Sequence, residues 1–202
     1  MVNDQPSPAW PTGFWFNEPA WTSKGDVVAF EAEQGSDLWR TTSYGFTRDS
    51  GHAFMTRIDV GAAVEVDLLV NTDALYDQAG ILVRGSPTSW LKAGIEFFDD
   101  HPHLGAVLTH GMSDWSSHPV PSWDGKVATI RVSRGPDSVT VRARITGEPW
   151  HLVRLAPMPG RRPLFAGPYC CAPSRSGFVA EFSRFAVLPA DRSLHGDTNE
   201  DA

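Results

Sequence analysis

The sequence predicts a single all-β domain of the sandwich or barrel type, and three observations support this fold class. Apolar and polar residues alternate over about a dozen short runs, which is the period-two pattern of half-buried strands. Turn-forming residues separate the runs, and the chain contains 18 glycines and 16 prolines. The one stretch with helix-like composition, residues 73–78, is too short to form a stable helix alone. Many short strands with few helices typically form a sandwich or a barrel.

The expected strands follow one another from residue 27 to residue 187. The first clear run is Val27–Ala32, and the alternation of apolar residues with Glu65 and Asp67 marks the run at 63–71. Runs at 78–84 and 91–98 are joined by a Gly-Ser-Pro-Thr-Ser turn. Runs at 126–133 and 138–146 flank an Arg-Gly-Pro-Asp step that is typical of a hairpin turn. The remaining runs span residues 54–60, 104–110, 150–155, 165–171 and 178–187.

Length and composition fit one folded domain, which we expect at residues 10–188. Of the 202 residues, 41% are hydrophobic and 20% are charged, so a sizeable core is possible. We expect the polar ends, residues 1–9 and the acidic tail 189–202, to be flexible. The formal net charge of −7 argues against a nucleic-acid partner, which requires a basic patch. The sequence leaves a monomer or a homodimer open.

The sequence carries no membrane or secretion signal. No run reaches the roughly 18 apolar residues that a membrane helix requires, so we expect no membrane partner. Residues 1–9 lack the positive and apolar regions of a secretory signal. We therefore expect a cytoplasmic protein.

The residues that commonly hold metals or form disulfides are few. The only two cysteines, Cys170 and Cys171, are adjacent, and neighbouring Cα atoms, ~3.8 Å apart, are closer than ordinary disulfides prefer. Both are predicted to be reduced. His101 and His103 have the spacing of a weak metal pair, but the proline between them favours a solvated turn. We expect no metal and no other cofactor.

Two expected neighbouring strands place polar side chains on one common face. Successive side chains of a strand point to opposite sides of a sheet, so residues 79, 81 and 83, with 91, 93 and 95, form an apolar face. The opposite face carries two glycines, at positions 80 and 94, and four polar side chains: Gln78, Arg84, Lys92 and Glu96. Glycine inside a strand often marks a close approach to the backbone, so this face is a candidate ligand site. The alternative is a solvated sheet face without a ligand.

Five aromatic residues lie in or beside segments rich in Gly, Ser, Thr and Asp. They are Trp39, Tyr44, Trp90, Trp115 and Trp123. Aromatic rings in such segments often stack on sugars, because one face of a sugar ring is rich in C–H groups. The alternative is packing at the edges of the sandwich, where tryptophan buries a large area.

Several motifs, in order, resemble one known family. They are residues 15–19 (WFNEP) with Trp21, 35–46 (GSDLWRTTSYGF), 76–84 (YDQAGILVR), 90–96 (WLKAGIE), 113–116 (SDWS), and the late Ala-Pro at 172–173 followed by Gly177, Phe178 and Phe182. They are similar to the domain-of-unknown-function 1349 family, also called the YesU-like or regulation-of-enolase-protein-like family. The resemblance covers roughly residues 14–188.

The resemblance implies a concanavalin-A-like jelly roll of two antiparallel sheets with a site on the concave face. The matching residues are Trp39, Tyr44, Gln78, Arg84, Lys92 and Glu96. Trp115, one of the five aromatic residues above, is a further candidate ligand contact. The run at 104–110 departs from the family pattern, because His110 stands where we expect a basic residue. We keep His110 among the candidate ligand contacts. The family is associated with carbohydrate use by fold and context.

Three functions remain open from the sequence. The first is a lectin-like domain that binds a carbohydrate or glycoside. The second is an enzyme acting on such a molecule, a hydrolase, lyase or epimerase, with Glu96 and Lys92 as the catalytic candidates. These two residues lie about 13 Å apart along one strand at ~3.3 Å per residue, and the Glu-x-Asp-x-x-Glu signature of glucanases with this fold is absent. The third is a regulatory protein-interaction domain, which would expose an apolar patch.

Overall fold

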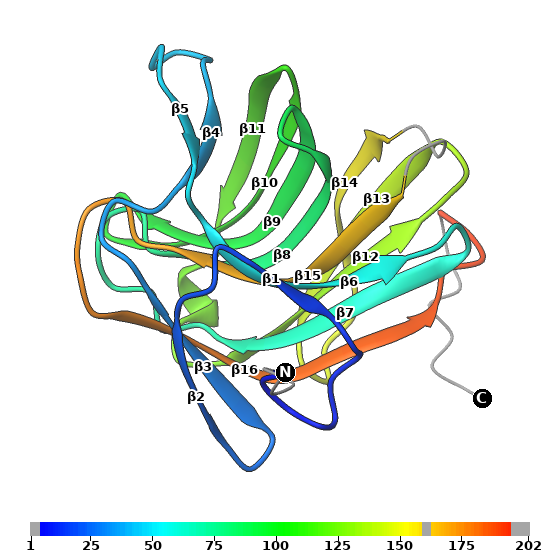
Figure 1. Ribbon diagram of the computed structural model, residues 1–202, viewed down its shortest axis with the longest axis horizontal. Helices are drawn as coiled ribbons and strands as arrows, with labels where there is room; N and C mark the ends of the chain where they lie inside the picture. Colours follow the sequence, from blue (N-terminus) through cyan, green and yellow to red (C-terminus); the bar gives the residue numbers. More distant parts are fainter. Residues whose placement is uncertain (1–4, 159–162, 195–202) are drawn as a thin grey trace.

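The computed structural model describes residues 5–158 and 163–194, and these form two seven-stranded antiparallel sheets packed face to face (Figure 1). The first sheet, called the concave sheet here, contains, in spatial order, β1 (Phe14–Phe16), β6 (His52–Ile58), β15 (Leu164–Cys171), β8 (Gln78–Ser86), β9 (Ser89–Phe98), β10 (His101–His110) and β11 (Met112–Pro119). The second, the convex sheet, contains β14 (His151–Pro157), β13 (Ser138–Ile145), β12 (Val127–Arg134), β7 (Ala62–Leu69), β16 (Phe178–Pro189), β3 (Val27–Ala32) and β2 (Ala20–Lys24).

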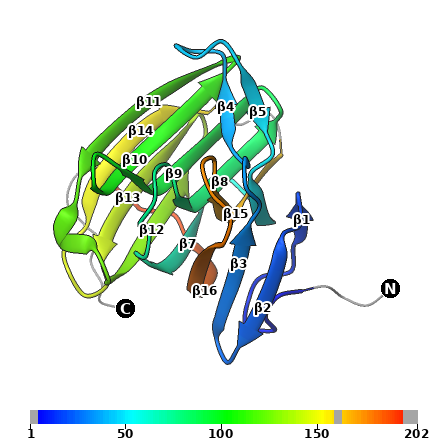
Figure 2. The same cartoon turned by 90° about the vertical axis from the view of Figure 1, so that its left-hand side faces the viewer.

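Two smaller elements complete the described chain. The strands β4 (Leu38–Arg40) and β5 (Thr47–Asp49) form a separate hairpin. A single turn of 3-10 helix, η1 (Pro121–Trp123), follows β11. Within the described residues, therefore, no helix is long and apolar enough to cross a membrane. The predicted fold class, a concanavalin-A-like jelly roll of two antiparallel sheets, is confirmed, and Figure 2 shows its two layers from the side.

Each of the eleven runs expected from alternation overlaps a strand, and β3 has the predicted limits. Sequence reasoning missed β1, β2, β4, β5 and β11. The most consequential omission is β11, at the edge of the concave sheet. Seven of its eight residues are exposed and only Ser113 is buried, so the strand has no apolar alternation that marks it in the sequence.

The main core lies between the two sheets and follows the predicted alternation. Ala79, Ile81 and Val83 of β8 face it, as do the alternate apolar residues of β9. Trp10 closes one side of this core, with ring centroids 6.0 Å from Phe30 and 5.4 Å from Phe185. The other face of β8 and β9 is therefore turned toward the concave side, as predicted.

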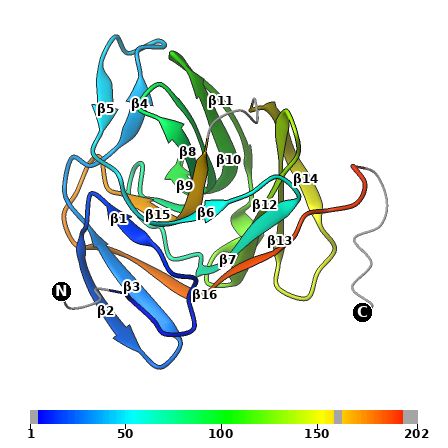
Figure 3. The same cartoon turned by 45° about the vertical axis from the view of Figure 1, so that its right-hand side comes forward.

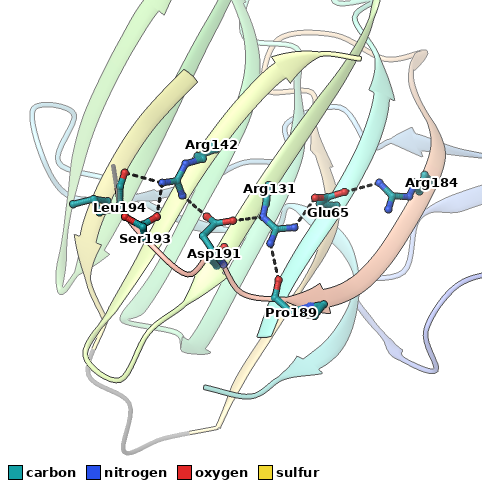
Figure 4. A network of polar contacts seen from close by, with 9 residues as sticks. Glu65, Arg131, Arg142, Arg184, Pro189, Asp191, Ser193 and Leu194 are labelled. Atoms are coloured by element: carbon teal, nitrogen blue, oxygen red, sulfur yellow. Dashed lines mark hydrogen bonds and ion pairs between the residues drawn. The ribbon is translucent and has the colours of Figure 1, made fainter. Parts of the chain in front are cut away.

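The outer face of the convex sheet carries a chain of ion pairs (Figure 4). Glu65 accepts hydrogen bonds from Arg131 at 2.6 Å and from Arg184 at 2.5 Å. Asp191 joins Arg131, at 2.7 Å, to Arg142. The side chains of Glu65 and Asp191 are only 8% and 10% exposed, so the segment that follows β16 is bound to the sheet.

Some residues of the expected flexible ends, 1–9 and 189–202, make hydrogen bonds with the folded domain. Pro189 is the last residue of β16, and its carbonyl accepts a hydrogen bond from Arg131. The carbonyls of Ser193 and Leu194 accept hydrogen bonds from Arg142. At the other end, Gln5 donates hydrogen bonds to two backbone carbonyls. Residues 1–4 and 195–202 of the expected flexible ends lie outside the described residues.

Candidate functional site

A pocket of about 230 Å³ opens on the concave sheet. Figures 1 and 3 show the two structures that enclose it, the β4–β5 hairpin on one side and β11 on the other, with β8, β9 and β10 between them. The lining residues are Asp37, Trp39, Tyr44, Phe46, Tyr76, Gln78, Lys92, Glu96, Val107, Trp115 and Pro173. The volume is below the roughly 300–1,000 Å³ of pockets for drug-sized ligands, so the pocket suits a small molecule.

Two paired glycines allow the polar groups of the floor to meet. In the β8–β9 register Gly80 pairs with Gly94, between the pairs Gln78–Glu96 and Leu82–Lys92. A Cβ atom at Gly94 would lie 2.2 Å from the carbonyl oxygen of Ala79, which no side chain can occupy. Since nothing projects from these two positions, the side chains of Lys92 and Gln78 reach each other, and the Lys92 Nζ donates to the Gln78 Oε1 at 2.6 Å.

Asp37 binds the Lys92 ammonium group from the other side of the pocket. The distance from the Lys92 Nζ to the Asp37 Oδ1 is 3.3 Å, and both side chains are largely buried. Burial by itself lowers the pKa of Lys92, but the negative charges nearby, Asp37 first, outweigh it and raise the pKa above its usual value. Lys92 is therefore a fixed positive charge at neutral pH.

The Glu96 carboxyl group lines the same pocket from β9. Burial raises the pKa of Glu96 to about 7, the positive charge of Lys92 opposes this shift, and the negative charge of Asp37 adds to it. Lys92 is paired with Asp37 and not with Glu96. Glu96 consequently exchanges its proton near neutral pH, in a pocket where a ligand can reach it.

The walls of the pocket are aromatic. On the hairpin, the Trp39 and Tyr44 rings meet edge to face at 5.5 Å, and the Tyr44 and Phe46 rings stack at the same centroid distance. On the facing side, Trp115 of β11 packs edge to face on Phe98 at 5.3 Å. Tyr44 and Trp115 are 54% and 37% exposed, so both rings present free surface to a ligand.

Local backbone structure positions the hairpin and the mouth of the pocket. The hairpin turns tightly, with a hydrogen bond of 2.7 Å from the Thr41 N–H to the Phe46 carbonyl and a positive φ of 74° at Gly45. Tyr76 also has a positive φ, 65°, just before β8. Burial and the neighbouring Tyr44 and Glu96 raise the pKa of Tyr76, so its hydroxyl stays protonated as a hydrogen-bond donor.

The structure brings six of the eight predicted ligand contacts together: Trp39, Tyr44, Gln78, Lys92, Glu96 and Trp115. It does not place Arg84 or His110 in the pocket. Arg84 binds the Asp49 carboxylate at 2.8 and 2.6 Å and lies over the Phe16 ring, which holds the base of the hairpin. His110 contacts the Ser89 hydroxyl at 3.2 Å and the Pro157 carbonyl at 2.8 Å.

Two of the five aromatic candidates serve packing and not the pocket. Trp90 is completely buried beneath the hairpin, and Trp123 is buried in the main core. Asp114 of the SDWS motif does not line the pocket either. It instead pairs with Arg154 of β14 at 2.7 Å, because Asp114 and Trp115 point to opposite sides of β11.

Five lining residues were not predicted as contacts: Asp37, Phe46, Tyr76, Val107 and Pro173. Asp37 and Phe46 lie in the motif at 35–46, and Tyr76 shares the face of Gln78 by alternation, so a signal existed for these three. Val107 is an ordinary apolar strand residue, and Pro173 lies beyond β15. Pro173 belongs to the Ala-Pro motif at 172–173, whereas nothing in the local sequence marks Val107 as a pocket residue.

The groups that bind metals or act as nucleophiles lie elsewhere or are inert. Within residues 5–158 and 163–194, no three His, Cys, Asp or Glu side chains gather as a metal site. His103 stacks on Phe98 with ring centroids 3.6 Å apart. Cys170 and Cys171 are free, fully buried thiols, and burial raises the pKa of each. The chemistry of the pocket thus rests on Asp37, Lys92 and Glu96.

Comparison with known proteins bears out the motifs. The model of a family described as protein of unknown function (DUF1349) matches residues 15–190. Regulation of enolase protein 1 from Saccharomyces cerevisiae is 37% identical over 185 residues, which cover 91% of this chain and 93% of the relative. The crystal structure of a functionally unknown protein from Saccharomyces cerevisiae has 36% identity and a TM-score of 0.82, covering 88% of this chain and 96% of that one.

A more distant structure shares the fold alone. Xylan β-1,4-xylosidase from Bacillus halodurans C-125 has a TM-score of 0.61 at 13% identity, and the match covers 92% of this chain but 41% of the xylosidase. The family match spans nearly all of the sandwich, from β1 to the end of β16, including every element around the pocket. The chain described here therefore belongs to the DUF1349 family of proteins.

Proposed function

We propose that this protein binds a carbohydrate in the pocket on its concave sheet. The observation that carries the proposal is the Glu96 carboxyl group, which faces the pocket between aromatic walls. No described residue offers a hydrogen bond to it, whereas Lys92 is already held by Asp37 and Gln78. Because the Glu96 side chain is half-buried and lines the pocket, a ligand hydroxyl is a fitting partner for its carboxyl group.

The rest of the lining matches the two surfaces of a sugar. Aromatic rings at Tyr44 and Trp115 are exposed and suit the C–H face of a pyranose ring. Asp37, Gln78 and Glu96 offer oxygen acceptors for the hydroxyl groups, and the Lys92 ammonium group offers a donor. A few polar groups in an otherwise apolar pocket are typical of sites that orient a small ligand.

The charge balance favours an uncharged sugar. Asp37 neutralises Lys92 across 3.3 Å, which leaves Glu96 as the remaining ionisable carboxyl group in the pocket. A uronic acid or a sugar phosphate would bring a negative charge toward it, and like charges repel strongly in a partly buried site. The xylosidase with the same fold is named for a carbohydrate polymer, which supports the ligand class but not a particular sugar.

An enzyme acting on the same ligand is the second candidate, and a specific observation favours it. A carboxyl group with a pKa of about 7 is suited to donate or accept a proton at neutral pH. Glu96 would be the acid–base residue in this case. Lys92 would position the ligand, since its raised pKa keeps it protonated and unable to act as a base.

A regulatory role is the third candidate, favoured by the name of the yeast relative, Regulation of enolase protein 1. Exposed aromatic residues at the mouth of the pocket, Tyr44, Phe46 and Trp115, would then contact a protein. The cytoplasmic location and the monomeric or homodimeric state are predictions that accompany all three candidates.

A thermal-shift screen against neutral mono- and oligosaccharides and glycosides, followed by calorimetry on each hit, tests the proposal. Binding to the native state raises Tm by mass action. We expect Glu96→Gln and Trp115→Ala each to weaken binding about tenfold or more, equivalent to ~1.4 kcal/mol. The control is Glu31→Gln, at an exposed site on β3 of the convex sheet.

The same screen separates the candidates. A sugar that binds and stays chemically intact supports the binding domain, and a sugar that is consumed by the wild type but not by Glu96→Gln supports the enzyme. Equal affinity in wild type, Glu96→Gln and Trp115→Ala would remove the pocket from the proposal. If no sugar binds, the regulatory candidate is tested by capture of purified yeast enolase with wild type and Trp115→Ala.

A further inference from the structure

The β4–β5 hairpin covers part of the concave sheet with a second apolar cluster. Leu38 and Trp39 pack onto Leu82, Trp90 and Val107, which all face the concave side. Leu38, Leu82 and Trp90 have no exposed surface. The surface that an uncovered concave sheet would offer to a long ligand is thus already filled by the protein itself.

At this end of the site the hairpin also joins the opposite wall. The Arg40 N–H donates to the Ser113 hydroxyl oxygen at 2.9 Å, and the Arg40 Nε donates to the Gly111 carbonyl at 3.1 Å. Ser113 in turn lies 2.9 Å from the Thr109 hydroxyl, in a fully buried contact. The hairpin and the turn between β10 and β11 are therefore connected at this end of the site.

The exposure of the lining residues shows where the site opens. Trp39 and Lys92, next to this connection, are 8% and 4% exposed, whereas Tyr44 of the hairpin is 54% exposed. The Asp37–Lys92 ion pair connects the residue before β4 to the floor of the pocket. The site is thus closed beside Arg40 and Ser113, and its mouth lies toward Tyr44, Tyr76 and Glu96.

From this geometry we infer that the pocket accepts the end of a saccharide, one or two sugar rings, and excludes the interior of a polysaccharide chain. The inference rests on the proposed carbohydrate-binding function and specifies its ligand. A volume of about 230 Å³ agrees with so small an occupant. Further rings of a longer chain lie outside the mouth, where they gain little contact.

The test is a chain-length series measured by tryptophan fluorescence and calorimetry. The probes are matched gluco-, galacto-, manno- and xylo-oligosaccharides of one to six rings. In whichever series binds, we expect Kd to change by no more than about threefold between two and six rings, less than 1 kcal/mol. On an insoluble polysaccharide of the same sugar, we expect retention to increase when limited hydrolysis multiplies the chain ends at constant mass, and Trp115→Ala to remove retention.

The outcomes are distinct for the two proposals. The closed pocket is overturned if Kd falls tenfold or more from two to six rings. It is also overturned if retention depends on the mass of polysaccharide and not on the number of chain ends. Either result leaves carbohydrate binding in place. Absence of binding in all four series, including the single sugars, overturns the proposed function and this inference together. Binding that levels off at one or two rings supports both.

Discussion

Lys92 and Gln78 form a 2.6 Å hydrogen bond between their side chains, although they are not paired in the register of their strands. Gln78 pairs with Glu96, and Lys92 pairs with Leu82. The bond exists because the pair of residues between them, Gly80 and Gly94, has no side chains. A sheet with ordinary residues at these two positions would separate the groups that now form the polar floor of the pocket.

Replacing Lys92 with methionine tests the floor directly. The substitution leaves the largely buried Asp37 carboxylate without its cation, and removal of one partner of a buried ion pair costs about 3–5 kcal/mol. We expect the free energy of unfolding in urea to fall by a value in this range. The control is Arg57→Met, because the Arg57–Asp59 pair is 65% and 69% exposed and such pairs contribute at most ~1 kcal/mol. Equal losses in both variants would contradict the floor described here.

The raised pKa of Glu96 predicts a pH dependence of stability. The folded protein holds the Glu96 proton up to about pH 7, whereas the unfolded chain releases it near 4.5. Between these values the native state binds more protons than the unfolded state, so stability falls as pH rises. Asp37, Lys92, Tyr44, Tyr76 and Tyr169 are the other titratable groups around this pocket.

Glu96→Gln isolates this contribution. Relative to the wild type, we expect the variant to gain stability progressively from pH 4.5 to pH 7 and to hold a constant advantage above that. The advantage is on the order of 2 kcal/mol at ~1.4 kcal/mol per pH unit, after allowance for partial exposure. Urea unfolding of both proteins at pH 5, 6, 7 and 8 measures it, with Glu31→Gln as the matched control. Parallel curves for wild type and Glu96→Gln would show that the Glu96 carboxyl group is not perturbed.

Gly94→Ala tests the requirement for an empty position in the floor. The new Cβ would lie 2.2 Å from the Ala79 carbonyl oxygen, so the two strands must separate locally. We expect a loss of stability of about 1–3 kcal/mol and a loss of ligand binding. Gly135→Ala is the control, because its Cβ would approach only the Ser138 side chain and backbone, at 3.2 and 3.4 Å. A Gly94→Ala protein as stable as the Gly135→Ala protein would exclude the proposed close approach.

Asp191→Asn tests the attachment of the segment after β16. Asp191 bridges Arg131 and Arg142 on the convex sheet (Figure 4), and its loss leaves two arginines with less compensation. We expect the free energy of unfolding in urea to fall by about 3 kcal/mol. Ligand affinity should not change, because the convex sheet is remote from the pocket. Asp114→Asn, which removes an exposed pair with Arg154, serves as the control at no more than ~1 kcal/mol. A segment that contributes nothing would show the same small effect for both variants.

The sequence by itself determined the fold class and the polar composition of the floor. Strand alternation is a local property, since side chains two residues apart share a face. It therefore placed Gln78, Lys92 and Glu96 together, with the core residues of β8 and β9 on the other side. The short turn between the two strands made them neighbours, so no distant contact was needed to predict the floor.

Tertiary structure alone decided which side chains complete the pocket. Asp37 reaches Lys92 across 55 positions in the chain, and Arg40 reaches Ser113 across 73. Docking of the β4–β5 hairpin buried Trp90, left Tyr44 exposed and engaged Arg84 at the hairpin base. These outcomes depend on the burial of apolar surface between segments far apart in the sequence. The alternation of residues within one strand does not indicate which distant segment will cover a given face of the sheet.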